Sequence, residues 1–168
     1  MHIIAQTPRF VIRNFRPEEE KIYMALFDDE RVTVHLPNRS RMEHLEIFRK
    51  ALNDYTKHKG LGRWGMFNNL DGDFMGLCLL RNYDDEEGKV ELGYVLHQKY
   101  WGKGIASEMA LILVGYGFTH ANALEIVAVT TLGNTGSQKV LQNAGMERMS
   151  NIKRDGEELA YFRVAKSM

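Results

Sequence analysis

One stretch of the chain joins a strand-like run, a glycine-rich turn and the start of a helical pattern, and it could bind an anion. It runs from Glu91 to Glu108, with Gly102 and Gly104 directly before the helix. Glycine lets a backbone approach a ligand closely, and the first N–H groups of a helix have no partner within it. The helix dipole adds positive charge at that end, which favours phosphate or pyrophosphate. The alternative is a turn that only connects a strand to a helix.

The common nucleotide-binding patterns do not fit this turn. The chain has no GxxxxGK pattern followed by Ser or Thr, so a P-loop is absent. A dinucleotide site needs GxGxxG and an acid at the end of the next strand. Here Ser107 stands in place of the third glycine, and Val129-Thr130-Thr131 ends that strand without a carboxylate. GxSxG and HExxH are also missing and the histidines lack metal-ligand spacing, so we expect neither a serine hydrolase nor a metal site.

Three segments resemble motifs of one enzyme family. Residues 101–106 (WGKGIA) occupy the frame of a loop that begins with Gln or Arg and ends in Gly-x-Gly or Gly-x-Ala, with Trp101 replacing the first residue. Residues 134–146 match a helix motif with Asn, then Ser, then a final Gly-Phe pair, with Met146 replacing Phe. Residues 9–15 resemble an opening RLxLR strand. The chain is thus similar to the GNAT superfamily of acetyl-CoA-dependent N-acetyltransferases, and most similar to its RimJ/RimL-like ribosomal-protein-alanine acetyltransferase branch.

The resemblance implies a fold and a way to bind the acyl donor, acetyl-CoA. The fold is an α/β (α+β) GNAT domain over residues 1–168, with a mixed central sheet of about seven strands flanked by about four helices. A splayed parallel pair of strands would hold the pantetheine arm, and a free backbone N–H near Val95 or Leu96 would polarise the acetyl carbonyl. The cofactor-binding residues implied are Val95, Leu96, His97, Gly102, Lys103, Gly104, Ile105, Ala106, Ser107 and Asn134.

Acetyl transfer from a thioester to an amine needs a base, an acid and a held carbonyl. By the resemblance, Glu91 is the candidate general base, and the alternative is a strand glutamate in a salt bridge. Ser137 is the candidate acid for the leaving sulfur, or simply a residue of the first helical turn. Many GNAT enzymes have a tyrosine where this chain has Leu141. Asn134 would bond the cofactor arm, cap a helix, or do both.

The acceptor is less defined than the donor. Tyr94, Trp64 and Asn82 are the candidate residues of the acceptor site, with packing or surface roles as alternatives. The acceptor is a primary amine, either a protein N-terminus or a small amine such as a polyamine or aminoglycoside. Two other functions remain open at this point: a non-catalytic CoA-binding sensor or scaffold, and an acyltransferase that uses another acyl-CoA such as succinyl-CoA.

The helices and strands that must position these residues can be predicted from capping signals and hydrophobic periodicity along the chain. Pro17 with the following acids predicts a helix start, with Ile22, Ala25 and Leu26 facing inward. Ser40 and Glu43 form a capping-box pattern before a second helix. Two more helices are predicted at 105–118 and 137–144. Strands are predicted at 9–15, 63–69, 74–81, 89–97, 124–130, 147–152 and 159–165.

Composition narrows the class of protein. The 168 residues include 22 Lys and Arg against 22 Asp and Glu, so the basic excess typical of nucleic-acid binding is missing. One cysteine, Cys78, excludes an internal disulfide. No signal peptide or bilayer-spanning run is seen, so we expect a cytoplasmic protein that does not bind membranes. A homodimer is possible, and the exposed edge of the C-terminal hairpin is one candidate contact.

Overall fold

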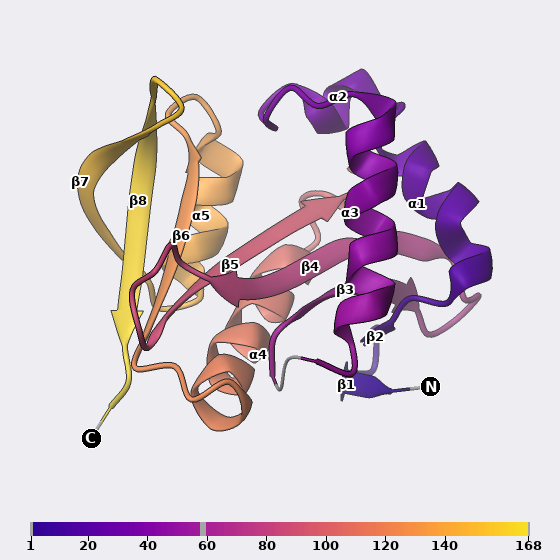
Figure 1. Ribbon diagram of the computed structural model, residues 1–168, viewed down its shortest axis with the longest axis horizontal. Helices are drawn as coiled ribbons and strands as arrows, with labels where there is room; N and C mark the ends of the chain where they lie inside the picture. Colours follow the sequence, from indigo (N-terminus) through magenta and orange to yellow (C-terminus); the bar gives the residue numbers. More distant parts are fainter. Residues whose placement is uncertain (1, 58–59, 168) are drawn as a thin grey trace.

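The computed structural model describes residues 2–57 and 60–167. Its strands form one mixed sheet in the order β1-β2-β3-β4-β5-β6-β8-β7 (Figure 1). The strands are β1 (Ile3–Gln6), β2 (Phe10–Asn14), β3 (Gly62–Asn68), β4 (Phe74–Asn82), β5 (Lys89–Leu96), β6 (Glu125–Thr131), β7 (Glu147–Arg154) and β8 (Glu157–Ala165). The helices are α1 (Glu20–Leu26), α2 (Glu30–Thr33), α3 (Arg41–Asp54), α4 (Ile105–His120) and α5 (Thr135–Asn143), with 3-10 turns η1 (Pro17–Glu19) and η2 (Gln98–Tyr100).

The predicted α/β class and element order are confirmed, with two additions. The sheet has eight strands because β1 pairs with β2, and the short helix α2 adds to the four predicted helices. The capping box is present as predicted: Ser40 Oγ accepts the Glu43 N–H at 3.1 Å, and Glu43 Oε1 accepts the Ser40 N–H at 2.9 Å. β7 is an edge strand, so the predicted exposed hairpin edge exists, whereas a homodimer stays a prediction.

The inward face of α1 differs from the prediction. Leu26 is buried as predicted, together with Tyr23 and Met24, whereas Ile22 is 39% exposed and Ala25 is exposed as well. The segment begins as the 3-10 turn η1 and becomes α-helical only at Glu20. Because a 3-10 turn has about 3.0 residues where an α-helix has 3.6, counting an α-helical period from Pro17 gives the wrong phase.

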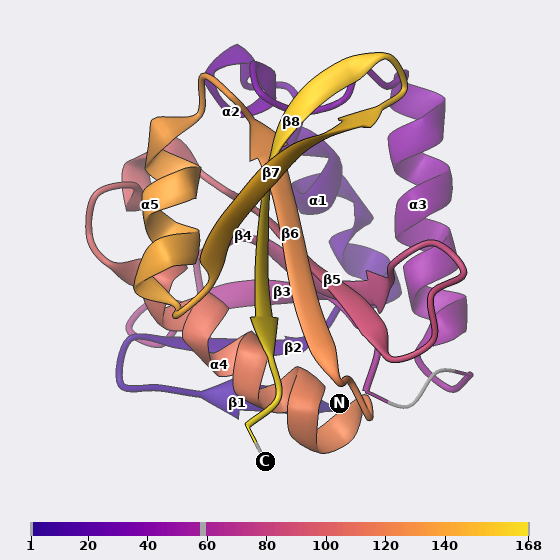
Figure 2. The ribbon, with the colours of Figure 1, turned by 90° about the vertical axis from the view of Figure 1, so that its left-hand side faces the viewer.

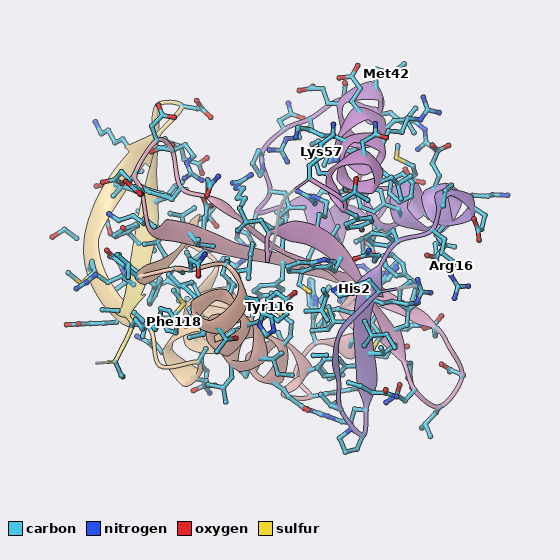
Figure 3. The ribbon with its side chains drawn as sticks, turned by 60° about the horizontal axis from the view of Figure 1, so that its bottom comes forward. His2, Arg16, Met42, Lys57, Tyr116 and Phe118 are labelled. Carbon is cyan, nitrogen blue, oxygen red and sulfur yellow. The ribbon has the colours of Figure 1, made fainter. Side chains whose placement is uncertain are left out.

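Two helical layers cover the sheet, one on each face. α1 and α3 pack on one face over an aromatic cluster that includes Phe15, Tyr23 and Phe48. α4 and α5 pack on the other face, where Met109 and Leu113 are fully buried. Figure 2 shows α3 and α5 on opposite sides of the strands, and Figure 3 labels Met42 on α3 and Tyr116 on α4. None of the helices within residues 2–57 and 60–167 has the length and apolar character needed to cross a membrane.

The sheet parts between β5 and β6, and this parting positions the candidate site. The two strands pair in parallel only from Lys89 with Glu125 to Glu91 with Val127. Beyond that point β6 stays paired with β8 as far as Thr131, whereas β5 continues beside β4 alone to Leu96 (Figure 1). The predicted splayed parallel pair is therefore present.

Candidate active site

A cleft of about 1070 Å³ opens where β5 and β6 separate. One half is formed by the end of β5, the glycine loop before α4, the end of β6 and the start of α5. The other half is formed by the segment between α2 and α3 together with charged side chains of β3, β4 and the β7–β8 hairpin. We call these the donor half and the acceptor half.

The end of β5 presents to the donor half backbone N–H groups that have no partner among residues 2–57 and 60–167. The N–H of His97 donates to the Met75 carbonyl at 2.8 Å, which fixes its direction toward β4. The β4–β5 register runs without a bulge to Leu96. Because neighbouring N–H groups along a strand point to opposite sides, those of Tyr94 and Leu96 point to the side that β6 has left. Leu96, rather than Val95 or His97, thus carries the free donor at the strand end.

The Trp101 side chain fixes the carbonyl group of Leu96. Its indole Nε1 donates to the Leu96 oxygen at 2.9 Å, while the side chain remains 46% exposed. The bond joins the end of β5 to the beginning of the glycine loop. Trp101 therefore has a structural use at the position where the GNAT motif has Gln or Arg.

The glycine loop has the conformation that an anion site needs. Gly102 has φ +72° and Gly104 has φ +77°, values that a side chain makes unfavourable. In α4, Glu108 N–H donates to the Gly104 carbonyl at 3.1 Å, so the N–H groups of Ile105 and Ser107 precede the helical ladder. No atom of the residues that the structure describes lies within 4 Å of a Cβ added at Gly102, so the loop is open to a ligand on that side. The loop fits a pyrophosphate.

Arg9 braces this loop from the β1–β2 turn. Its Nη1 donates to the Lys103 carbonyl at 2.6 Å, and its guanidinium forms an ion pair with Glu108 on α4. The Nε to Glu108 Oε2 distance is 3.1 Å. Sequence reasoning missed this role because 94 residues separate Arg9 from Lys103 and no local pattern links them.

The start of α5 brings three predicted residues together. Asn134 Oδ1 accepts the Ser137 N–H at 3.1 Å, so Asn134 is the N-cap of α5. Ser137 and Tyr94 both line the cleft, and Leu141 is buried one turn later. Burial raises the pKa of Tyr94, and hydrogen bonding with the Ser137 side chain opposes this only in part. Tyr94 is therefore a protonated donor beside Ser137, on the α4 side of the sheet.

Glu91 forms an ion-pair centre. It is 5% exposed, and Arg154 binds both of its oxygens at 3.1 and 3.0 Å while Arg81 Nη2 binds Oε2 at 3.1 Å. Burial alone would raise the pKa of Glu91, but the hydrogen bonds and charges of Arg154 and Arg81 outweigh it and lower the pKa. A carboxylate held in this way is a weak proton acceptor, so the structure favours the salt-bridge alternative over the general-base prediction.

The geometry can be compared with known proteins. Residues 9–147 match the model of the acetyltransferase (GNAT) domain. The chain belongs to the GNAT acetyltransferase family. This GNAT chain is 27% identical over 154 residues to the uncharacterized N-acetyltransferase p20 of Bacillus licheniformis, covering 90% of this chain and 86% of p20.

Solved structures share the fold of this GNAT domain. Ribosomal-protein-S5-alanine acetyltransferase from Vibrio fischeri superimposes with a TM-score of 0.82 at 16% identity, covering 96% of this chain and 95% of its own. RimL, a ribosomal L7/L12 alpha-N-protein acetyltransferase solved in complex with CoA, gives a TM-score of 0.81 at 13% identity and 98% coverage of both chains. At such identities the likeness shows the fold.

Two residues predicted for the acceptor site of this GNAT domain lie elsewhere. Trp64 is 2% exposed in the core on the α4 side, with its ring 5.7 Å from that of Tyr116. Asn82 is exposed at the end of β4 and does not line the cleft. Alternation along β3 places Trp64 on the face opposite the acceptor half. Asn82 pairs with Val90, at the level where β5 and β6 are still joined. Both predictions are corrected.

Most of the residues predicted to bind the cofactor line the cleft, and two do not. Residues that line the cleft are Val95, Leu96, Gly102, Gly104, Ile105, Ala106, Ser107 and Asn134. His97 does not line it, because its ring packs edge-on against Phe74. Lys103 does not line it either: its carbonyl accepts a hydrogen bond from Arg9, and its ammonium lies 5.9 Å from the Tyr100 ring centre. Within residues 2–57 and 60–167 no three His, Cys, Asp or Glu side chains could hold a metal ion, and His58 lies outside those residues.

Proposed function

We propose that this protein transfers the acetyl group of acetyl-CoA to a primary amine. The parted strands β5 and β6 carry the proposal, because they leave the N–H groups of Tyr94 and Leu96 unpaired beside a glycine loop at a helix start. That RimL, which shares the fold, was solved with CoA supports the same donor here.

The donor half can bind acetyl-CoA largely through its backbone. The N–H groups of Gly102 to Ser107 would hold the pyrophosphate, with the dipole of the 16-residue helix α4 behind them. The gap beside β5 would take the pantetheine arm, and the Leu96 N–H would bond the thioester carbonyl oxygen. Asn134 Oδ1 is used in capping α5, so its amide Nδ2 is the group that can donate to the arm.

The transfer forms a C–N bond between the amine and the thioester carbon and breaks the C–S bond. One proton leaves the amine and one reaches the departing sulfur. We assign the second proton transfer to the Tyr94 hydroxyl, supported by Ser137, because Tyr94 lines the donor half and its raised pKa keeps it protonated. This pair replaces the tyrosine that many GNAT enzymes carry at the position of Leu141.

For the first proton we propose His35 instead of Glu91. His35 lies between α2 and α3, lines the cleft, and makes a 2.7 Å contact between its Nδ1 and Thr131 Oγ1 at the end of β6. This contact fixes the ring of His35 against the end of β6. Both oxygens of Glu91, in contrast, are held by arginines.

Thermal unfolding with acetyl-CoA, CoA, succinyl-CoA and NADH, followed by thiol release with a panel of amines, tests the function. A ligand at a hundredfold excess over its Kd should stabilise the fold by about 2.7 kcal/mol. We expect stabilisation by the CoA species alone and thiol release from acetyl-CoA. Binding of CoA without acetylation of any amine would favour the sensor function. Faster thiol release from succinyl-CoA than from acetyl-CoA would indicate succinyl-CoA as the donor. No stabilisation by any CoA species would contradict the proposal.

A further inference from the structure

The acceptor half of the cleft carries more positive than negative side chains. Outside the donor half, the cationic residues that line the cleft are Arg31, Arg39, Arg63, Arg81 and Arg154, against the acids Glu91, Asp155 and Glu157. Arg31 is neutralised by Asp29 at 3.0 Å. Arg81 and Arg154 share the single carboxylate of Glu91, so this group of three keeps a net positive charge.

Two further arginines have no carboxylate partner among residues 2–57 and 60–167. Arg63 is half-buried, and within the described part of the chain its guanidinium bonds only the Tyr23 hydroxyl, at 3.3 Å. Arg39 is half-buried and forms no ion pair with the described residues. Glu43 lies within electrostatic range of Arg39, but its carboxylate accepts the Ser40 N–H at 2.9 Å.

The sheet register places Arg63 on the face where the acceptor half lies. Arg63 is opposite Leu79, and Leu79 is opposite Gly93 on β5. Residues directly opposite each other project from the same face, and two strand spacings put the Cα of Arg63 about 10 Å from that of Gly93. The Leu79 side chain packs over Gly93, 3.3 Å from where a Cβ would lie. Arg63, Leu79 and Gly93 all line the cleft, so Arg63 borders the same cleft as the parted end of β5.

Half-buried positive charge without a partner is unfavourable unless a ligand supplies the opposite charge. Arg39 and Arg81 are both close enough to Arg63 to lower its pKa further, after burial, which is the main cause. Guanidinium groups bind carboxylates and phosphates with two parallel hydrogen bonds, which makes such a cluster suited to an anionic group.

We propose that the acceptor is an anionic amine, a primary amine that also carries a carboxylate or phosphate bound by Arg63 and Arg39. The inference rests on the proposed acetyl transfer and narrows its substrate class. A polyamine or aminoglycoside, which the sequence left open, would instead meet like charge in the acceptor half. The anionic group can belong to a small molecule or to an acidic peptide N-terminus.

Matched acceptors test this inference. Phosphoethanolamine is compared with ethanolamine, and the peptide Ser-Glu-Glu-Gly with Ser-Gln-Gln-Gly and Ser-Lys-Lys-Gly, by thiol release from acetyl-CoA. Calorimetric binding of the same probes to the protein–CoA complex gives a readout that needs no turnover. We expect the anionic member of at least one pair to bind and react about tenfold better or more, since hydrogen bonds between charged groups are the stronger ones.

The variants Arg39→Gln and Arg63→Gln should each reduce this preference about tenfold. Arg39→Gln removes no hydrogen bond or ion pair among residues 2–57 and 60–167, so it keeps the test valid if Arg63→Gln, which loses the Tyr23 bond, folds poorly. Arg49→Gln is the matched control, because Arg49 on α3 pairs with Glu20 outside the cleft and should leave the preference unchanged. The inference would be overturned if the neutral or cationic probes react as well as their anionic partners. It would also be overturned if the preference for anionic probes is unchanged in Arg39→Gln. Arginine-dependent probe binding without acetyl transfer would instead overturn the proposed function alone.

Discussion

The donor and acceptor halves of the cleft are built in different ways. The donor half is mainly backbone: unpaired N–H groups of β5, two glycines with positive φ and the start of α4. The acceptor half is mainly side chains, with arginines from separate elements gathered around one buried glutamate. A backbone site can hold a donor shared by a whole family, whereas a side-chain site can change its acceptor through single substitutions.

The largest effect is expected in the acceptor half, at its central carboxylate. Glu91→Gln should lower the free energy of unfolding by about 3 kcal/mol at pH 7, because it breaks a buried ion pair whose arginines keep some contact with water. Folding lowers the pKa of Glu91, so its stabilisation is present above the unfolded pKa and is lost as pH falls through the folded pKa. Urea unfolding should therefore show the two proteins converging under strongly acidic conditions. A constant difference would contradict the ion-pair role.

A smaller free-energy effect is expected at the junction of the halves. Tyr94→Phe should reduce kcat about a hundredfold, the lower end for loss of a general acid, with little change in the KM for acetyl-CoA. Tyr116→Phe is the control, since Tyr116 packs on Trp64 away from the cleft. Steady-state kinetics of both variants make the test. If kcat is unchanged in Tyr94→Phe, the acid must be sought elsewhere, first at Ser137.

The donor half should respond to changes of backbone conformation. Gly104→Ala should weaken acetyl-CoA binding about tenfold, because a side chain at positive φ costs about 1–2 kcal/mol and shifts the N–H groups. Gly72→Ala is a matched control: Gly72 has φ +74° in an exposed turn and nothing near its added Cβ. It should cost similar stability and leave the Kd unchanged. Equal losses of acetyl-CoA affinity in both variants would contradict a specific role of the glycine loop in binding.

The smallest effect is expected at the brace on the donor half. Arg9→Gln should raise the Kd of acetyl-CoA by about fivefold at most, because exposed ion pairs contribute roughly 0–1 kcal/mol. The Arg9 side chain is 44% exposed. Titration calorimetry at low and high salt would measure the Kd of acetyl-CoA for both proteins. The difference in Kd between wild type and variant should shrink at high salt. An affinity equal to wild type at low salt would show that the loop needs no brace.

The same contrast explains what the sequence could predict. The glycine loop, the helix starting at Ile105 and the N-cap Asn134 are local patterns, so their elements could be placed from the sequence. The parting of β5 and β6 came only with the family resemblance. The acceptor half depends on Arg63, Arg81 and other residues distant along the chain, whose spacing carries no signal.

The predictions that differ from the structure concern residues whose surroundings depend on packing between distant segments of the chain. The prediction of Trp64 and Asn82 for the acceptor site rests on their strands alone, and a strand's position does not tell which sheet face each side chain occupies. The general-base prediction for Glu91 rests on its strand and on the family resemblance, and its partner Arg154 lies 63 residues away, so no local pattern reveals the ion pair. The phase error in α1 came from a turn type that the sequence did not reveal.

Amide hydrogen exchange with and without acetyl-CoA tests the central claim most directly, because the claim concerns backbone N–H groups. We predict that acetyl-CoA slows exchange at Tyr94, at Leu96 and across Gly102 to Ser107. Exchange in β3, which lies away from the parting, should change little by comparison. Binding that protects other segments while Leu96 and the glycine loop exchange as before would contradict the account.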